Sequence, residues 1–370
     1  MKKYFFFAAA LVALAACSKS PVAETADPDE VFTGSEMYPI TFSSNVVATK
    51  AKVKGSGSVA AWNDSQTLYV YGIKRDEAAD TLCWKDGIQI DNVAAAAPAD
   101  GTEGAINVYD PAFPGENKPF YYDNSGRYDF FGYYVDDAFV DGQETPALNE
   151  GTITLPIAID GTQDVMLAYA DRNAAVEGTS YSASKMFSAY GVRKGIIPNL
   201  KFEHQLSRFI FQVKKGTVPA EGEPEPVVQP GVLYINSLSV DSYADAMMTI
   251  VGENRGLALP EGAELTYFPL TDRGTPFEQT LVEGTANVLG ESVLVMPGRD
   301  TYTLKFVLEN EAGVQQETDN MSFSIAGGAL AGKSYTITLT VYNLEQIELK
   351  VSLVEWDDDT EPINIGEDED

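Results

Sequence analysis

Strict alternation of apolar and polar residues constrains this chain more than any other feature of its sequence. Residues 302–308, 335–341 and 347–353 each place apolar side chains at every second position, with mostly polar residues between them. A period of two puts one face of a strand on a core and the other face in water. Helical periodicity is almost absent, so the pattern predicts strands throughout.

The same reasoning extends over most of the chain. Further strands are predicted at residues 38–42, 67–73, 128–135, 152–159, 208–214, 233–240 and 293–296. Gly and Pro residues punctuate the joins, and a few short helices are expected in insertions, for example near Ala183–Tyr190. Many short strands with such turns are typical of antiparallel β-sandwiches. The sequence therefore predicts an all-β protein.

The length of 370 residues favours two domains rather than one. An apolar strand pattern restarts near residue 199, after a stretch rich in Ser, Ala and Gly. We therefore predict an N-terminal β-sandwich domain at residues 37–198 and a C-terminal β-sandwich domain, with an acidic tail, at residues 199–370.

The N-terminus has the composition of an export signal. Lys2 and Lys3 precede an apolar run that ends in Leu14-Ala15-Ala16-Cys17. Residues 1–16 are predicted to be a lipoprotein signal peptide and Cys17 to be the lipidation site. The alternative is an ordinary secretory signal with a chance cysteine. Residues 17–36, rich in Pro, Ala, Asp and Glu, are expected to form a disordered tether.

The charge balance excludes several partners. The chain has 25 Lys and Arg against 55 Asp and Glu, a net charge of −30. A surface this acidic repels nucleic acid and anionic headgroups, so no nucleic-acid partner is expected. The acidic residues after Trp356 have no Gly-containing ligand loop of fixed spacing, and we expect them to solvate the chain rather than bind metal.

No catalytic motif is present. His204 is the only histidine, and it lies in an alternating strand pattern that indicates a structural role. There is no Gly-x-Ser-x-Gly elbow, phosphate loop or dinucleotide fingerprint. Carboxylates are abundant, but nothing marks any two of them as a pair. The sequence predicts a protein that is not an enzyme and that needs no cofactor.

Several segments, in order, match one family pattern. They are Leu14–Cys17, Ile40-Thr41-Phe42, Thr49-Lys50-Ala51, Trp62-Asn63-Asp64, Phe202-Glu203-His204-Gln205-Leu206-Ser207, Leu330–Tyr335 and Val351–Trp356. Together they resemble the fimbrillin family, the type V pilins of Bacteroidetes. The chain departs from the pattern in having Lys50 where Arg is usual and in a Leu330–Tyr335 motif that is one residue short before its Gly.

The resemblance implies two transthyretin-like antiparallel β-sandwich domains and a fimbrial subunit. Such a protein is exported as an outer-membrane lipoprotein held through Cys17, and it then joins other fimbrial subunits at the cell surface. In the family, the first strand fills a groove until an Arg/Lys-directed protease cuts after it. A neighbour's C-terminal segment then takes its place by β-augmentation.

Residues 37–54 are the corresponding segment here. Tyr38–Val47 is the candidate removable strand, and Lys50, Lys52 and Lys54 are the candidate cleavage sites. The alternative is that these lysines form an ordinary solvated loop. If the host protease is specific for arginine, the site stays uncut, which would suit an anchor subunit.

The candidate donor strand is Gln346–Trp356. Its alternating residues Ile347, Leu349, Val351 and Leu353 would fill the neighbour's groove. The alternative is an ordinary terminal strand of the C-terminal domain.

A second function is left open by the aromatic residues. Those at 119–122 and 130–134 could stack on sugars, although core packing is favoured because adjacent side chains of a strand face opposite ways. The competing hypothesis is thus a surface lipoprotein that binds glycans and does not polymerise. A receptor on a host or bacterial surface is left open.

Overall fold

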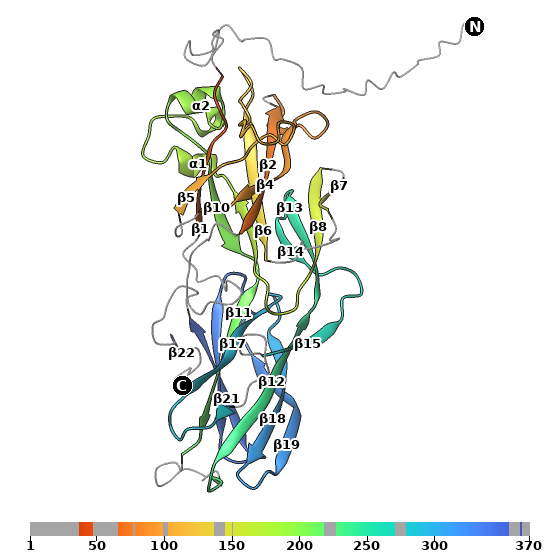
Figure 1. Cartoon of the computed structure of the whole chain (residues 1–370), viewed down its shortest axis with the longest axis vertical. Coiled ribbons are helices and arrows are strands. Elements are labelled where there is room, and N and C mark those ends of the chain that lie inside the picture. Colours follow the sequence, from red (N-terminus) through yellow and green to blue (C-terminus); the bar gives the residue numbers. More distant parts are fainter. Residues whose placement is uncertain are drawn as a thin grey trace, which may run out of the picture.

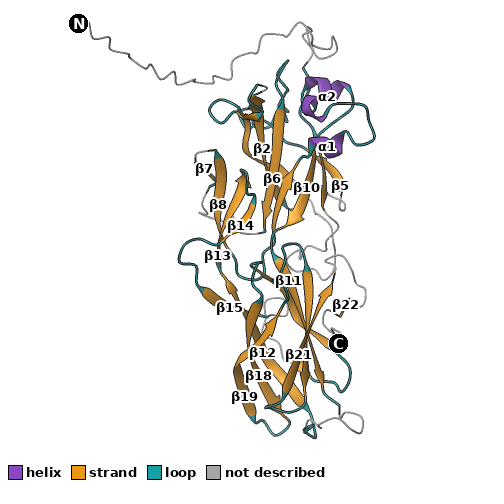
Figure 2. Cartoon of the chain, turned by 180° about the vertical axis from the view of Figure 1, so that it is seen from behind, coloured by secondary structure: helices purple, strands orange, loops and turns teal. Residues whose placement is uncertain are grey.

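The computed structural model of the chain describes residues 37–46, 66–76, 78–98, 103–136, 145–149, 151–217, 227–270, 279–354 and 363–364. These residues form an elongated molecule made almost entirely of strands, with the few helical turns at one end (Figures 1 and 2). The predicted all-β fold is confirmed. Within these ranges, no helix has the length and apolar character needed to cross a membrane.

The elements are numbered in chain order. The strands are β1 (Phe42–Val46), β2 (Thr67–Asp76), β3 (Thr81–Leu82), β4 (Ile88–Ala96), β5 (Glu103–Ile106), β6 (Tyr128–Val135), β7 (Ala147–Asn149), β8 (Thr152–Ala158), β9 (Val165–Tyr169), β10 (Asn199–His204), β11 (Ser207–Lys215), β12 (Leu233–Tyr243), β13 (Asp245–Val251), β14 (Gly256–Ala258), β15 (Leu265–Pro269), β16 (Gln279–Thr280), β17 (Asn287–Val295), β18 (Thr301–Asn310), β19 (Gln315–Ser324), β20 (Ser334–Val341), β21 (Ile347–Val354) and β22 (Ile363–Asn364). The helical turns are α1 (Arg172–Ala175), η1 (Ala183–Lys185) and α2 (Ala189–Arg193).

Each strand predicted from alternation overlaps an observed strand, although the one expected at residues 38–42 shares only Phe42 with β1. The pattern works best where a strand has one buried face, whereas β6 is buried on both faces. In β18, for example, Tyr302, Leu304, Phe306 and Leu308 are buried, while Lys305 between them is exposed and Thr303 and Val307 are half-buried. The helical turns η1 and α2 fall in the insertion where short helices were expected.

Four sheets are formed by the described strands. An eight-stranded sheet has the order β3-β2-β6-β9-β10-β1-β5, with β4 also paired to β2. A four-stranded sheet, β14-β13-β8-β7, faces part of it (Figure 1). The other two sheets are β17-β11-β20-β21-β22 and β15-β12-β18-β19, with β16 paired to β12. Most pairs are antiparallel, but β1 with β10 and β11 with β20 are parallel.

Two apolar cores hold these sheets together. The larger core lies between the facing sheets and continues from Tyr71 and Leu167 in the eight-stranded sheet to Phe209 and Tyr302 below it. The smaller core lies on the other face of the eight-stranded sheet and contains Phe42, Phe130 and Phe202. The half-buried residues of α1 and α2, such as Ala175 and Tyr190, pack against the smaller core.

The predicted domain division at residues 198/199 stays a prediction. Strand pairing favours a position a few residues later, because β10 (Asn199–His204) pairs with β9 and β1. We call the two sheets that contain β1–β10, β13 and β14 the N-terminal part, and the other two sheets the C-terminal part. β13 and β14 follow β12 in the chain but pair with β8 of the N-terminal part, so the chain crosses between the parts more than once.

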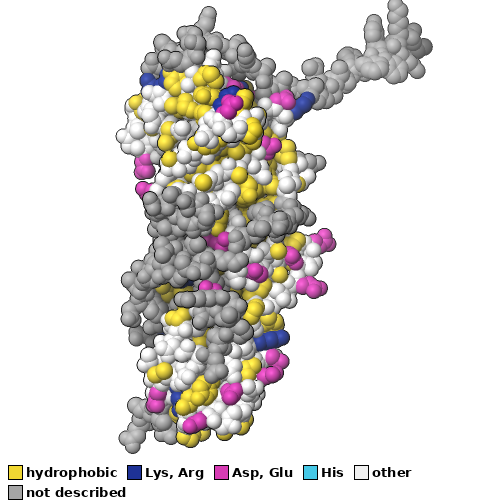
Figure 3. All heavy atoms as spheres, in the orientation of Figure 1, with side chains coloured by type: hydrophobic (Ala, Val, Ile, Leu, Met, Phe, Trp, Pro, Cys, Tyr) yellow, Lys and Arg dark blue, Asp and Glu magenta, His cyan; other side chains and the backbone are white. Residues whose placement is uncertain are grey.

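The surface agrees with the acidic composition. On the face drawn in Figure 3, Asp and Glu side chains are spread along both parts, while Lys and Arg are few.

Candidate functional site

The first described strand lies inside a sheet rather than at its edge. β1 pairs in parallel with β10, from Ser43 opposite Asn199 to Val46 opposite Phe202. On its other side it pairs antiparallel with β5, from Phe42 opposite Ile106 to Asn45 opposite Glu103. An interior strand satisfies the backbone groups of both neighbours, so its removal would leave two unpaired edges.

Side chains of the same segment fill the smaller core. Ile40 and Phe42 are 2% and 1% exposed, and the Phe42 ring meets Phe130 edge to face with 5.0 Å between ring centroids. Ser44, two residues further on, is also buried, and its hydroxyl donates to the Gly104 carbonyl at 3.5 Å. The intervening Thr41 is exposed. The alternation seen in the sequence therefore becomes three inward positions at 40, 42 and 44.

Residues before β1 are held by a second set of backbone contacts. The Ile40 N–H donates to the Phe120 carbonyl at 2.7 Å, and the Tyr122 N–H donates to the Tyr38 carbonyl at 3.0 Å. An isolated bridge joins Pro39 to Tyr121. Residues 38–40 and 42–46 are thus both paired with neighbouring backbone.

Four candidate site residues lie outside the described residues. These are the lipidation site Cys17 and the cleavage candidates Lys50, Lys52 and Lys54. The described residues end at Val46 and begin again at Gln66, directly before β2.

The candidate donor residues lie on β21, inside their own sheet. β21 forms a hairpin with β20, from Ser334 opposite Val354 to Val341 opposite Ile347. On its outer side, the described pairing is with the short β22, at Ser352 and Leu353 only. The rest of that outer edge, from Ile347 to Val351, has no strand partner among the described residues. β21 is therefore placed where a hairpin strand close to a sheet edge could leave.

The four candidate donor side chains are only partly covered. Ile347, Leu349, Val351 and Leu353 are half-buried and pack against the larger core. Glu348 and Lys350 between them are exposed. The geometry agrees with both interpretations, since an intradomain strand and a strand waiting to be donated would each present this face to the core.

The candidate removable strand and the candidate donor do not meet within one chain. β1 belongs to the N-terminal part and β21 to the C-terminal part, well apart along the molecule (Figure 1). An exchange of one for the other therefore needs two chains placed end to end.

His204 occupies an enclosed pair at the junction of the two parts. Its Nδ1 atom lies 2.7 Å from Oδ2 and 2.9 Å from Oδ1 of Asp164, and the two side chains are 0% and 1% exposed. Enclosed in this way, the imidazole has no access to a substrate, and the arrangement is that of a structural pair. Among the described residues, no group of three or more His, Cys, Asp or Glu side chains is arranged to hold a metal ion.

Most of the aromatic residues considered for sugar stacking belong to the cores, while Tyr121 is half-buried and lies in neither. Every residue of β6, including Phe130, Phe131, Tyr133 and Tyr134, is buried, and so is Tyr122. Phe130 lies in the smaller core and Phe131 in the larger one, as expected for adjacent residues of a strand. The prediction of core packing is confirmed.

Sequence reasoning missed the neighbours of β1. β5 is a four-residue strand, Glu-Gly-Ala-Ile, in which only Ile106 is buried. One apolar position gives no periodicity to detect. The motif containing Phe202 was found, but nothing in the sequence shows that this strand pairs in parallel with one so far before it.

Fold and sequence signals together define a class of protein. A model of prokaryotic membrane lipoprotein lipid attachment sites matches residues 1–18, which include Cys17. The chain is thus an all-β protein of the lipoprotein type with its first described strand enclosed in a sheet. The fimbrillin-like family model matches residues 49–356, and the chain belongs to that family. This membership supports a fimbrial subunit role and agrees with the expectation of a structural protein rather than an enzyme.

Solved structures of similar fold come from Bacteroidetes. A candidate cell adhesion protein of Bacteroides uniformis is 14% identical, with a TM-score of 0.44 over 86% of this chain and 98% of that one. A candidate cell adhesion protein of Bacteroides ovatus is 12% identical, with a TM-score of 0.45 over 90% of this chain and 100% of that one. The fimbrial anchor protein Mfa2 of Porphyromonas gingivalis is 12% identical, with a TM-score of 0.31 over 88% and 99%. A comparison with curated proteins finds no match. We base the family assignment on the sequence model alone.

Proposed function

We propose that this protein is a fimbrial subunit that polymerises by donor-strand exchange. The observation that supports it best is the position of β1, enclosed between β10 and β5 with Ile40 and Phe42 in the core. A strand in that position can be replaced only by another strand, because its loss exposes two hydrogen-bonding edges and an apolar groove.

The energetics favour replacement over simple loss. Burying a side chain such as Ile40 or Phe42 contributes roughly 1.5–3 kcal/mol each relative to exposure. The backbone pairs with β10 and β5 add to this. The precursor therefore holds its own strand until the covalent connection is cut. A neighbour's strand can then restore both the buried apolar side chains and the backbone hydrogen bonds.

In this proposal, the lipid at Cys17 first holds the precursor at the outer membrane. A protease then cuts after Lys50, Lys52 or Lys54, and residues up to the cut leave. The segment Gln346–Trp356 of another subunit enters the groove, with Ile347, Leu349, Val351 and Leu353 facing the core. The product is a cell-surface fimbrium made with other copies of this chain or with other fimbrial subunits, and it supports adhesion to a host or bacterial surface receptor.

The cleavage step is tested by replacing the three lysines together. Lys50→Gln, Lys52→Gln and Lys54→Gln in one chain should stall assembly and leave lipid-anchored precursor at the cell surface. The measurement is the yield of high-mass fimbrial ladders on gels of unheated surface fractions.

A matched control removes the same number of positive charges from another part of the chain. Lys85, Lys201 and Lys305 are exposed, and changing all three to Gln should leave the ladders at the level of the unmodified protein. Normal ladders from the Lys50, Lys52 and Lys54 triple variant would rule out processing at these residues.

A further inference from the structure

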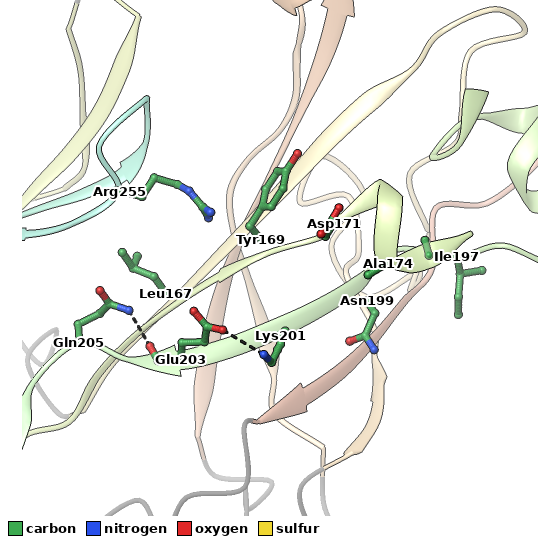
Figure 4. A pocket seen from close by; sticks show the side chains of 11 residues that line it. Leu167, Tyr169, Asp171, Ala174, Ile197, Asn199, Lys201, Glu203, Gln205 and Arg255 are labelled. Atoms are coloured by element: carbon green, nitrogen blue, oxygen red, sulfur yellow. Dashed lines mark hydrogen bonds and ion pairs between the residues drawn. The ribbon is translucent and has the colours of Figure 1, made fainter. Parts of the chain in front are cut away.

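One face of the eight-stranded sheet is covered over only part of its width. The four-stranded sheet packs against β6 through β13, and beyond its β14 edge the outward side chains of β9 and β10 line a hollow of about 590 Å³. Asp171, the N-cap of α1, and Ala174 and Ala175 within it close one end, and Arg255 approaches from the segment that precedes β14 (Figure 4).

The floor of this hollow offers side chains rather than free backbone. β9 pairs with β6 and β10, and β10 pairs with β9 and β1, so the main-chain groups of both strands are used within the sheet. An extended peptide has no ladder to join on this floor. A ligand here must instead be recognised by the outward side chains, which are Asn199, Lys201 and Glu203 on β10, Gln205 directly after it, and Leu167 and Tyr169 on β9.

Arg255 carries a positive charge that has no direct ion-pair partner among the described carboxylates, although Glu203 and Asp129 lie close enough to attract it. Its guanidinium lies 4.6 Å from the centroid of the Tyr169 ring and donates one hydrogen bond, to the Ala168 carbonyl at 3.3 Å. No ion pair joins it to any described Asp or Glu. Burial lowers its pKa, so an anion that compensates its charge would be favoured. A guanidinium has five N–H donors, which leaves a planar fork free for a carboxylate.

The other charged side chains of the hollow already have partners within the protein. Lys201 Nζ lies 3.2 Å from Glu203 Oε1, and Asp171 accepts a hydrogen bond from the Asn173 N–H as the cap of α1. Asn199 and the remaining carboxylate oxygens can still accept hydrogen bonds from a ligand's hydroxyl groups. The Asn199 amide can also donate hydrogen bonds to them. One unpaired cation beside several hydroxyl-binding groups fits a ligand that has a single carboxylate on a polyol.

We propose that this hollow binds a carboxylate-bearing saccharide, with the sugar carboxylate against Arg255 and its hydroxyl groups held by Asn199, Glu203 and Asp171. Such a site would give the subunit an adhesive function of its own, separate from polymerisation. It uses the outward face of β10, whereas strand exchange uses that strand's hydrogen-bonding edge and its inward face.

The test measures binding of two matched sugars to the full chain by titration calorimetry or ligand-observed NMR. Methyl glucuronide carries the carboxylate, and methyl glucoside has the same ring without it. The glucuronide, or the methyl glycoside of N-acetylneuraminic acid, should bind at least about tenfold more tightly than the neutral sugar. Arg255→Met should remove that preference, whereas Asn199→Ala should weaken the binding of both sugars and keep the ratio of their affinities.

Lys305→Gln is the matched control, because Lys305 is an exposed cation that also lies over a tyrosine ring, 3.9 Å from the Tyr267 centroid. It should leave both affinities unchanged, and thermal unfolding of each variant confirms that it is folded. Equal binding of acidic and neutral sugars, an unchanged preference in Arg255→Met, or absence of binding by both acidic sugars at millimolar concentrations would overturn the proposal. Equally tight binding of N-acetylaspartate would overturn it too, since that would show a carboxylate site without sugar recognition. None of these outcomes bears on strand exchange.

Discussion

Asp164 and His204 form the most completely enclosed charged contact described in the chain. Asp164 also accepts a hydrogen bond from the Val165 N–H at 2.8 Å, and the Asp136 N–H donates to its backbone carbonyl at 2.9 Å. His204 is the last residue of β10, three residues before β11 begins. The pair therefore holds the point where the chain passes from the N-terminal part to the C-terminal part.

Asp164→Ala should destabilise the protein by about 2–4 kcal/mol, because it leaves a buried imidazole without its partner. The measurement is the free energy of unfolding in denaturant. Lys201→Gln is the control, since it breaks an exposed ion pair on the same strand and should cost no more than about 1 kcal/mol. Equal effects of the two changes would contradict a structural role for the pair.

Buried tyrosines make stability depend on alkaline pH. Burial raises the pKa of Tyr122, Tyr128, Tyr133, Tyr134 and Tyr302 above the ordinary value of 10.0. Above that pH, the unfolded phenols lose their protons while the folded ones keep them, so the unfolded state binds fewer protons. The free energy of unfolding should then fall as pH rises above 10, by roughly 1.4 kcal/mol per pH unit for each such tyrosine.

Tyr122→Phe isolates one of these residues. The Tyr122 hydroxyl is buried and has no hydrogen-bond partner among the described residues. The variant should be more stable at pH 7 by about 1 kcal/mol. Its loss of stability between pH 10 and 11 should be smaller than that of the unmodified protein, by roughly 1 kcal/mol. Tyr109→Phe, at an exposed position, should change neither quantity, and an identical pH profile for all three proteins would contradict this account.

Individual strands differ in how far the sequence could predict them. β18, β20 and β21 were predicted because their apolar residues recur at every second position; in β20 the threonines that alternate with them are half-buried or buried rather than exposed. β19, which reads Gln-Gln-Glu-Thr-Asp-Asn-Met-Ser-Phe-Ser, was not predicted. It pairs only with β18 at the edge of its sheet, and its polar residues give no alternation to read.

The alternation of residues along one strand does not predict which distant strand it pairs with. The alternation at Ile40 and Phe42 was recognised from the sequence, but the enclosure of β1 depends on β5 and β10, whose positions are set by the whole sheet. The pairing of Met248 with Leu155, which brings β13 into the N-terminal part, is of the same kind. The sequence therefore predicted the strand that fills the candidate groove, but not the two strands that form the groove's edges.

β21 should be needed for polymerisation more than for the fold of the N-terminal part. Leu349→Asp together with Val351→Asp places two charges where half-buried apolar side chains pack, so a groove that accepts this strand would have to bury both charges. We expect fimbrial ladders to disappear while the N-terminal part keeps its protease-resistant fragment. Glu348→Gln with Lys350→Gln, on the exposed face of the same strand, should leave the ladders intact. Normal fibres from the Asp variant would rule out β21 as the donor.

At the scale of the whole molecule, the two halves of the proposed exchange lie at separate places. β1 is enclosed in the N-terminal part and β21 lies near a sheet edge in the C-terminal part (Figure 1). An elongated subunit with an acceptor in one part and a donor in the other forms head-to-tail contacts, and contacts of that kind extend into a filament when they do not close into a ring. The net charge of −30 keeps such chains soluble before they join.

The most direct test is the N-terminus and intact mass of the protein recovered from its native cell surface. Strand exchange predicts an N-terminus at Ala51, Val53 or Gly55, in high-mass ladders that dissociate on heating. A full-length monomer that begins at an acylated Cys17 would contradict it, because β1 would then still occupy its own groove.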